Sequence, residues 1–111
     1  MRTYIKDIKN HIDEEISIMG WVDVRRDHGK LIFVDVRDTT GVVQAVSFSG
    51  NADVHLIVDR FRDEWVVELT GKVNKRPEKM VNPEKAFGDV EVSITGAQVL
   101  SEAQELPFEK G

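Results

Sequence analysis

The chain has 111 residues, 41% of them hydrophobic, which is enough for one core and one domain of ordinary size. It has no cysteine, and its three histidines show no metal-ligand spacing, so a disulfide framework, a thiolate metal site and a bound metal are not expected. No apolar stretch approaches the roughly 20 residues that cross a bilayer, and the polar amino end lacks the core of a signal peptide. We therefore expect a cytoplasmic protein that does not enter a membrane.

The net charge of −5 is unevenly distributed along the chain. Residues 24–37 contain four basic and two acidic residues, and residues 71–88 contain five basic and two acidic residues. Most of the aspartate and glutamate residues lie outside these two windows. Opposing charge beyond a Debye length of about 8 to 10 Å is largely screened, so this split favours a local phosphate-binding patch over a basic coat.

The first strand is predicted over residues 16–25, where apolar and polar residues alternate. A loop at 26–30 follows, in which Gly29 can adopt a positive φ. The alternation places Ile16, Ile18, Gly20, Val22 and Val24 together on one side of this strand.

Two further strand-like runs, residues 31–37 and 42–48, flank a four-residue turn and predict a β-hairpin. Alternation places Phe33 and Gln44 on one face of this hairpin. The expected cross-strand pairs are Arg37 with Val42, Asp35 with Gln44 and Phe33 with Val46. The residues expected on the opposite, core-facing side are Ile32, Val34 and Val36. An aromatic ring beside an amide suits unpaired bases, which need a stacking partner and a group that recognises their edges.

A helix is predicted over residues 52–62, after the cap candidate Asn51, and two more strands over 65–74 and 90–100. The apolar stripe of the helix, expected to fill the core, is Val54, Ile57, Val58 and Phe61. Gly20 and Gly71 are expected at bulges or sharp bends that close a barrel.

This element order predicts an all-β fold, a five-stranded Greek-key OB-fold barrel with one α-helix between strands 3 and 4. Such barrels bind oligonucleotides on strands 2 and 3 and on the loops joining strands 1 to 2 and 4 to 5, where both basic windows fall. The long loop at 75–89 contains two prolines and several cations, and we expect it to be a binding loop.

Short motifs support a more specific assignment when they are taken in order. They are Gly20-Trp21-Val22, Arg25-Arg26-Asp27-His28-Gly29, Ile32-Phe33-Val34-Asp35-Val36-Arg37-Asp38, Gly41-Val42-Val43-Gln44, Arg76-Pro77-Glu78, Val81-Asn82-Pro83 and Glu91-Val92. Over nearly the whole chain this set resembles the amino-terminal anticodon-binding domain of bacterial-type aspartyl-tRNA synthetases. The resemblance implies an OB-fold domain over residues 1–104 and, over 105–111, the start of a hinge toward a catalytic domain.

The resemblance also implies roles for individual residues. Phe33 would stack on the middle anticodon base, Gln44 would bond a base edge, and Glu91 matches a position associated with the first base. The full implied anticodon-binding set is Arg26, His28, Phe33, Gln44, Arg76, Lys79, Asn82 and Glu91. The expected phosphate contacts are Arg25, Lys30 and Lys75. His28 resembles forms that also accept asparagine tRNA, whereas Lys79 resembles the strict forms.

The sequence thus predicts recognition of the aspartate anticodon GUC in a tRNA loop. Motifs of a ligase domain are absent, so we expect no catalysis by this chain, no cofactor, and a ligase domain in cis only if the native chain is longer. The isolated domain is expected to be a monomer. One alternative is a general single-stranded nucleic-acid-binding OB-fold protein. Another is a partner-docking barrel with Trp21 and Trp65 as interface anchors.

Overall fold

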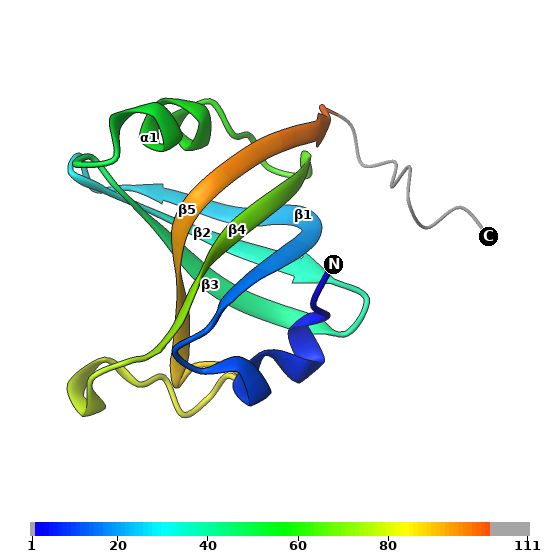
Figure 1. Cartoon of the computed structure of the whole chain (residues 1–111), viewed down its shortest axis with the longest axis vertical. Coiled ribbons are helices and arrows are strands. Elements are labelled where there is room, and N and C mark those ends of the chain that lie inside the picture. The colour runs from blue at the N-terminus through cyan, green and yellow to red at the C-terminus, as the bar shows by residue number, and fades with distance from the viewer. Residues whose placement is uncertain (1, 103–111) are drawn as a thin grey trace.

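Five strands form a closed barrel in the computed structural model, which describes residues 2–102 (Figure 1). The strands are β1 (Glu15–Asp27), β2 (Leu31–Asp38), β3 (Gly41–Phe48), β4 (Val66–Lys75) and β5 (Val90–Ser101). The helices are α1 (Ala52–Asp59) and two short 3-10 segments, η1 (Ile5–His11) and η2 (Glu78–Met80). The predicted OB-fold, with its helix between the third and fourth strands, is confirmed. The expected hinge at 105–111 lies outside the described residues.

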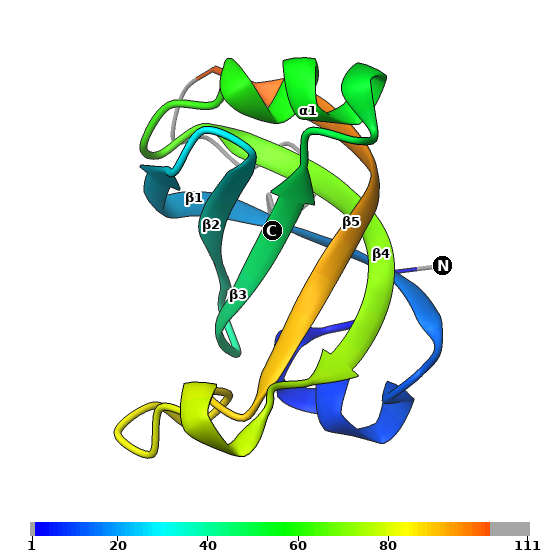
Figure 2. The same ribbon diagram turned by 90° about the vertical axis from the view of Figure 1, so that its left-hand side faces the viewer.

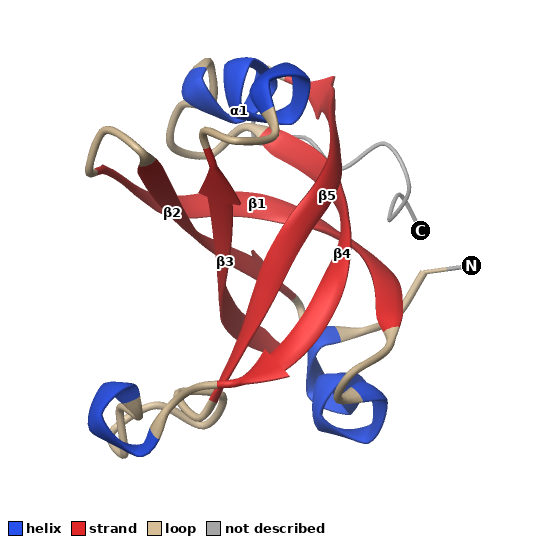
Figure 3. Ribbon diagram, turned by 60° about the vertical axis from the view of Figure 1, so that its left-hand side comes forward, coloured by secondary structure: helices blue, strands red, loops and turns tan. Residues whose placement is uncertain are grey.

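The barrel closes in the order β1-β2-β3-β5-β4, with β4 returning to β1 (Figure 3). All neighbouring strands are antiparallel except β3 and β5, which pair in parallel. The β2–β3 hairpin has the predicted register, in which Arg37 pairs with Val42, Asp35 with Gln44, and Phe33 with Val46. The core-facing side of β2 is also confirmed, because Ile32, Val34 and Val36 are at most 1% exposed.

The two ends of the barrel are covered by different segments (Figures 1 and 2). Helix α1 lies over one end, whereas η1 and the β4–β5 loop lie at the other. The helix ends at Asp59, earlier than predicted, and Phe61 enters the core from the turn that follows. Among residues 2–102, no helix has the length and hydropathy needed to cross a lipid bilayer.

Segment η1 is a feature that the sequence pattern did not predict. Its residues Ile5 and Ile8 are fully buried, and the backbone N–H of Ile5 donates to Asp38 Oδ2 over 2.9 Å. The other carboxylate oxygen of Asp38 accepts from the hydroxyl and N–H of Thr40 and from the N–H of Gly41. A buried carboxylate therefore joins the amino-terminal segment to the β2–β3 turn.

The end of β1 differs from the prediction in one respect. Val24 was predicted on the same side as Ile18 and Val22, which are fully buried, but it is 39% exposed. The β1–β2 register shifts between Val22 and Val24, and one extra residue in a strand moves the following side chains to the other face. A register shift between Thr70 and Gly71 matches the bulge expected at Gly71, whereas no shift occurs at Gly20.

Strand β2 passes so close to residue 20 that only a glycine fits there. A Cβ built there would overlap the carbonyl oxygen of Arg37 and come within 3.1 Å of Val36 Cγ1. We therefore expect Gly20→Ala to lower the free energy of unfolding by about 1 to 3 kcal/mol in urea denaturation, because the strands must move apart. Gly96→Ala is the matched control, since its nearest atom would be Thr70 Cβ at 3.6 Å. Equal stability of the two variants would contradict this explanation.

Candidate nucleic-acid interface

A cleft of about 440 Å³ opens between the outer face of the β2–β3 hairpin and the start of the β4–β5 loop. All five strands contribute to it, together with the β1–β2 and β4–β5 loops. Its lining residues are Arg26, His28, Leu31, Phe33, Gln44, Val46, Lys75, Arg76, Pro77, Met80 and Glu91. The cleft combines apolar surface with three cations and one carboxylate, which is a composition suited to a base and its phosphate.

Phe33 lies in the cleft and not in the core. Its ring is half-buried on the outer face of β2, because it alternates with the core residues Ile32 and Val34. The His28 ring contacts it edge-on, with the centroids 5.5 Å apart and the planes at 80°. His28 thus supports the ring from the β1–β2 loop, a geometry that aromatic pairs prefer.

A chain of polar contacts crosses the floor of the cleft. Arg26 donates to both carboxylate oxygens of Asp35, each over 3.2 Å, and to Gln44 Oε1 over 3.0 Å. The amide nitrogen of Gln44 donates to Glu91 Oε2 over 2.6 Å. Asp35 is only 4% exposed, so it anchors Arg26 from below. The orientation of the Gln44 amide follows, with its oxygen toward Arg26 and its nitrogen toward Glu91.

The β4–β5 loop is held against the barrel beside this network. Arg76 Nε donates to the carbonyl of Val90 over 3.0 Å, and its backbone N–H donates to the carbonyl of Asp89 over 2.9 Å. Lys9 of η1 pairs with Asp89 over 3.0 Å, and this hydrogen bond lowers the pKa of Asp89 below its usual value. The amino-terminal segment therefore helps to fix the loop that carries Arg76.

Seven of the predicted contact residues come together in the cleft. They are Arg26, His28, Phe33, Gln44, Lys75, Arg76 and Glu91. Lys30 and Lys79 are exposed outside its lining. Asn82 lies in a turn, where its side-chain oxygen accepts from the N–H of Glu84. Arg25 points toward α1 and bonds Asp27 and Asp59.

Arg37, the remaining cation of the first basic window, also lies outside the cleft lining. It donates to Asp23 over 3.0 Å and to Glu64 over 2.8 Å, and it lies over the Trp21 ring. The hydrogen bond with Glu64 is the main cause of a raised Arg37 pKa. Part of the basic charge that the sequence attributed to a binding patch therefore stabilises the barrel.

Four cleft residues were not predicted as contacts: Leu31, Val46, Pro77 and Met80. Leu31 and Val46 lie on the Phe33 face, so strand alternation could have identified them. Met80, which is 63% exposed, reaches the cleft only because η2 folds back beside it, and no local pattern encodes that. Within residues 2–102, no group of three or more histidine, aspartate or glutamate side chains could hold a metal ion.

Comparison with known proteins identifies the class. Residues 16–100 match the family described as OB-fold nucleic acid binding domain. Two relatives are the aspartate-tRNA(Asp/Asn) ligases of Thermosynechococcus vestitus, 44% identical over 97% of this chain and 18% of that protein, and of Corynebacterium glutamicum, 45% identical over 91% and 16%. The chain therefore spans under a fifth of the length of these curated relatives.

Solved structures share the fold. An aspartyl-tRNA synthetase from Entamoeba histolytica superposes with a TM-score of 0.82 at 20% identity, over 96% of this chain and 22% of that one. The asparaginyl-tRNA synthetase of the same organism gives a TM-score of 0.76 at 28% identity, over 98% of this chain and 25% of that one. The chain belongs to the OB-fold nucleic acid binding domain family. Within it, the chain matches the amino-terminal anticodon-binding domain of the bacterial-type aspartate-tRNA(Asp/Asn) ligases, as the sequence motifs implied.

Proposed function

We propose that this chain binds tRNA by its anticodon loop and selects the aspartate triplet GUC. The observation that carries the proposal is the position of Phe33 in an open cleft, directly beside the Arg26–Gln44–Glu91 network. A ring face contributes about 1 to 3 kcal/mol per stacked base but does not choose among bases. The choice must come from directional donors and acceptors, and the network supplies both.

The network divides these roles among its members. Glu91 Oε2 accepts from Gln44, which leaves Oε1 as an acceptor for N–H groups of a base such as guanine. Arg26 carries five donors, and its side chain is 39% exposed while bonded to Asp35 and Gln44. Its remaining donors can meet carbonyl oxygens of a base. Arg76 would act in the same way from the β4–β5 loop.

Phosphate binding falls to the cations around the cleft. Lys75 lines it, Lys30 is exposed in the β1–β2 loop and Lys79 is exposed on η2, so all three can neutralise the backbone of an entering strand. Asn82 would act from the turn beyond η2. Contacts of this kind release counterions, so affinity should fall with rising salt.

Titration with anticodon stem-loops tests the proposal. At a fixed salt concentration, we expect the GUC stem-loop to bind more tightly than one with an unrelated triplet in the same stem. A stem-loop with GUU measures how strictly the chain distinguishes the aspartate anticodon from the asparagine anticodon. By the family resemblance, His28 implies that both are bound, whereas Lys79 implies that only GUC is bound. Equal affinity for GUC and the unrelated triplet would contradict selective recognition.

Phe33→Ala should weaken GUC stem-loop binding by about 1 to 3 kcal/mol, because it removes the stacking surface. Isothermal titration calorimetry measures the change, and thermal unfolding shows whether the fold persists. Tyr4→Ala is the control, since this exposed aromatic lies in a different depression near the amino end. Unchanged affinity of a folded Phe33→Ala protein would remove the ring from the site.

A general single-strand binder is the second candidate, because a stacking ring accepts any base. Glu91 in the cleft argues against it, since a carboxylate repels phosphates but accepts bonds from selected bases. Competition with a homopolymer oligonucleotide separates the two. If the homopolymer displaces the GUC stem-loop at equal concentration, the general binder is the better description.

We further infer that the chain itself is not catalytic and acts as the recognition part of an aspartate-tRNA ligase. Its relatives bear that name and are more than five times its length, so a ligase domain in cis would supply the chemistry. We place the protein in the cytoplasm and expect the isolated domain to be a monomer, which size-exclusion chromatography with light scattering would measure.

A further inference from the structure

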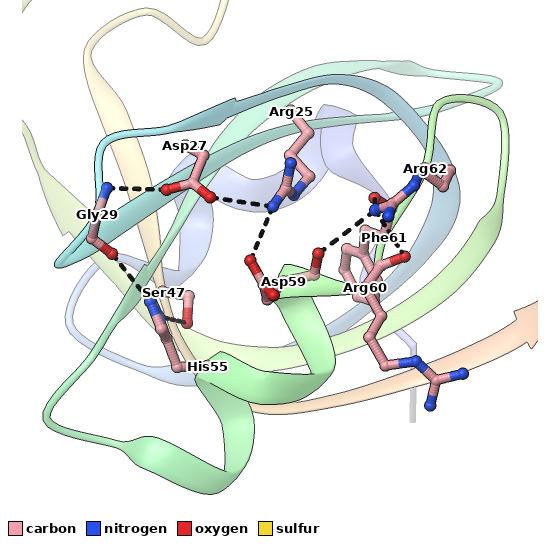
Figure 4. A network of polar contacts seen from close by, with 9 residues as sticks. All are labelled: Arg25, Asp27, Gly29, Ser47, His55, Asp59, Arg60, Phe61 and Arg62. Atoms are coloured by element: carbon pink, nitrogen blue, oxygen red, sulfur yellow. Dashed lines mark hydrogen bonds and ion pairs between the residues drawn. The ribbon is translucent and has the colours of Figure 1, made fainter.

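Helix α1 and the β1–β2 loop are joined by two polar links that lie outside the cleft (Figure 4). The first is His55 on α1. Its Nε2 lies 3.2 Å from the carbonyl oxygen of Gly29, and its Nδ1 lies 2.9 Å from Ser47 Oγ. A carbonyl only accepts, so Nε2 carries the hydrogen in this contact, while Nδ1 shares a hydrogen bond with the fully buried Ser47 hydroxyl.

The second link is Arg25, two residues before the end of β1. Its Nη2 donates to Asp59 Oδ1 at the end of α1 over 2.9 Å and to Asp27 Oδ2 over 3.2 Å. Asp27 Oδ1 in turn accepts the N–H of Gly29 over 2.8 Å. The Arg25 side chain is 20% exposed, and its Nε is buried without a hydrogen-bond partner. This guanidinium is therefore committed to two carboxylates.

Both backbone polar groups of Gly29 are held through these links. Asp27 accepts from its N–H and His55 donates to its carbonyl, at a residue whose φ of 76° few side chains tolerate. The preceding residue is His28, whose backbone N–H donates to Leu31 over 2.8 Å and whose ring contacts Phe33. The position of the His28 ring therefore depends on how Gly29 is held.

Helix α1 is a firm support for this arrangement. Val54 and Val58 pack in the core, and Phe61 just beyond the helix is fully buried. Arg62 Nη1 donates to the carbonyls of Asp59, Arg60 and Phe61 over 3.4, 3.2 and 2.8 Å (Figure 4). These bonds satisfy carbonyls that the end of a helix leaves without partners.

We propose that His55 and Arg25 are positioning residues for RNA recognition: they clamp the β1–β2 loop to α1 and so hold His28 against Phe33. Neither residue lines the cleft. The proposal rests on the RNA-binding function proposed above and assigns Arg25 to the loop in place of a phosphate contact. It makes α1, which lies outside the binding face, part of the recognition apparatus.

A double-mutant cycle between His55 and His28 tests the clamp. We expect His55→Ala to weaken GUC stem-loop binding by about threefold to tenfold in the wild-type background and to have little effect when His28 is already alanine, because both changes remove the same support. His55→Gln should restore part of the affinity, since its amide can donate to the Gly29 carbonyl. Leu56→Ala, on the same helix and 67% exposed, is the matched control.

The salt dependence separates the two roles of Arg25. Affinity falls with salt, so the slope of log affinity against log salt is negative. Removing one phosphate contact makes this slope less steep by about one, whereas loss of a positioning residue leaves it unchanged. We expect Arg25→Gln to weaken binding with an unchanged slope. The clamp would be overturned if His55→Ala binds with full affinity, or if its loss of affinity is the same in both His28 backgrounds. A less steep salt dependence for Arg25→Gln would also overturn it. Failure of the wild-type chain to bind any stem-loop would instead contradict the proposed function.

Discussion

Replacing Arg26 with alanine is expected to lower the free energy of unfolding by about 2 to 3 kcal/mol and to weaken RNA binding in the same protein. The Asp35 side chain is 6% exposed and receives two hydrogen bonds from Arg26. Without them its nearest cation is Lys85, 3.6 Å away and largely exposed. A buried carboxylate that loses its partner retains most of its desolvation cost, and the 39% exposure of Arg26 keeps the estimate below that of a fully buried pair.

The double variant Arg26→Ala/Asp35→Asn separates the two effects. Removing the carboxylate charge should recover much of the stability, because no uncompensated charge remains buried. It should not recover binding, since the donors toward the base and toward Gln44 are still missing. Urea denaturation measures the first quantity and stem-loop titration the second. If the single variant is as stable as the wild type, Asp35 depends on Arg26 less than the geometry indicates.

Phe61→Ala should cost about 3 to 5 kcal/mol of stability, the largest effect of any single change considered. Phe61 is the largest of the fully buried side chains in the described part of the chain, and its truncation removes buried apolar surface and leaves a cavity. Domains of this size are stable by about 5 to 15 kcal/mol. The variant should therefore unfold at a much lower temperature, which calorimetry or circular dichroism would detect.

Leu56→Ala is the control for Phe61→Ala, because this residue lies on α1 and is 67% exposed. Its replacement should change stability by no more than about 0.5 kcal/mol. A loss below about 1 kcal/mol for Phe61→Ala would mean that the end of the barrel under α1 collapses around the missing ring. In that case α1 would be a less rigid support for the β1–β2 loop than the packing indicates.

Much of the candidate binding face could be predicted from local pattern. Strand alternation needs only neighbouring residues, so Phe33, Gln44 and the core side of β2 follow once the hairpin register is set. The four-residue turn at 38–41 sets that register. The basic windows were also visible, because charge along a loop does not depend on packing. These features are encoded within about 20 consecutive residues.

Other features were missed or depended on packing. Segment η1 was not predicted, although Ile5, Ile8 and Ile12 recur at the i, i+3, i+7 spacing of one helical face. Ile5 and Ile8 are fully buried, and Ile12 packs against the same core. Val24 turned outward because a register shift against β2 interrupted the alternation. The helix pattern ran on to Arg62, but the helix stops at Asp59, and Phe61 is fully buried from the turn beyond it.

The amino-acid sequence by itself determined the order of the five strands and α1, the β2–β3 register and the face that carries Phe33, because these depend on periodicity and turn length. The tertiary structure decided what each charge does. Asp35 and Arg26 look like groove residues of opposite sign, and only the fold shows the first buried beneath the second. Arg25 and Asp59 are 34 positions apart, and the ion pair between them forms only because barrel closure brings α1 over the β1–β2 loop.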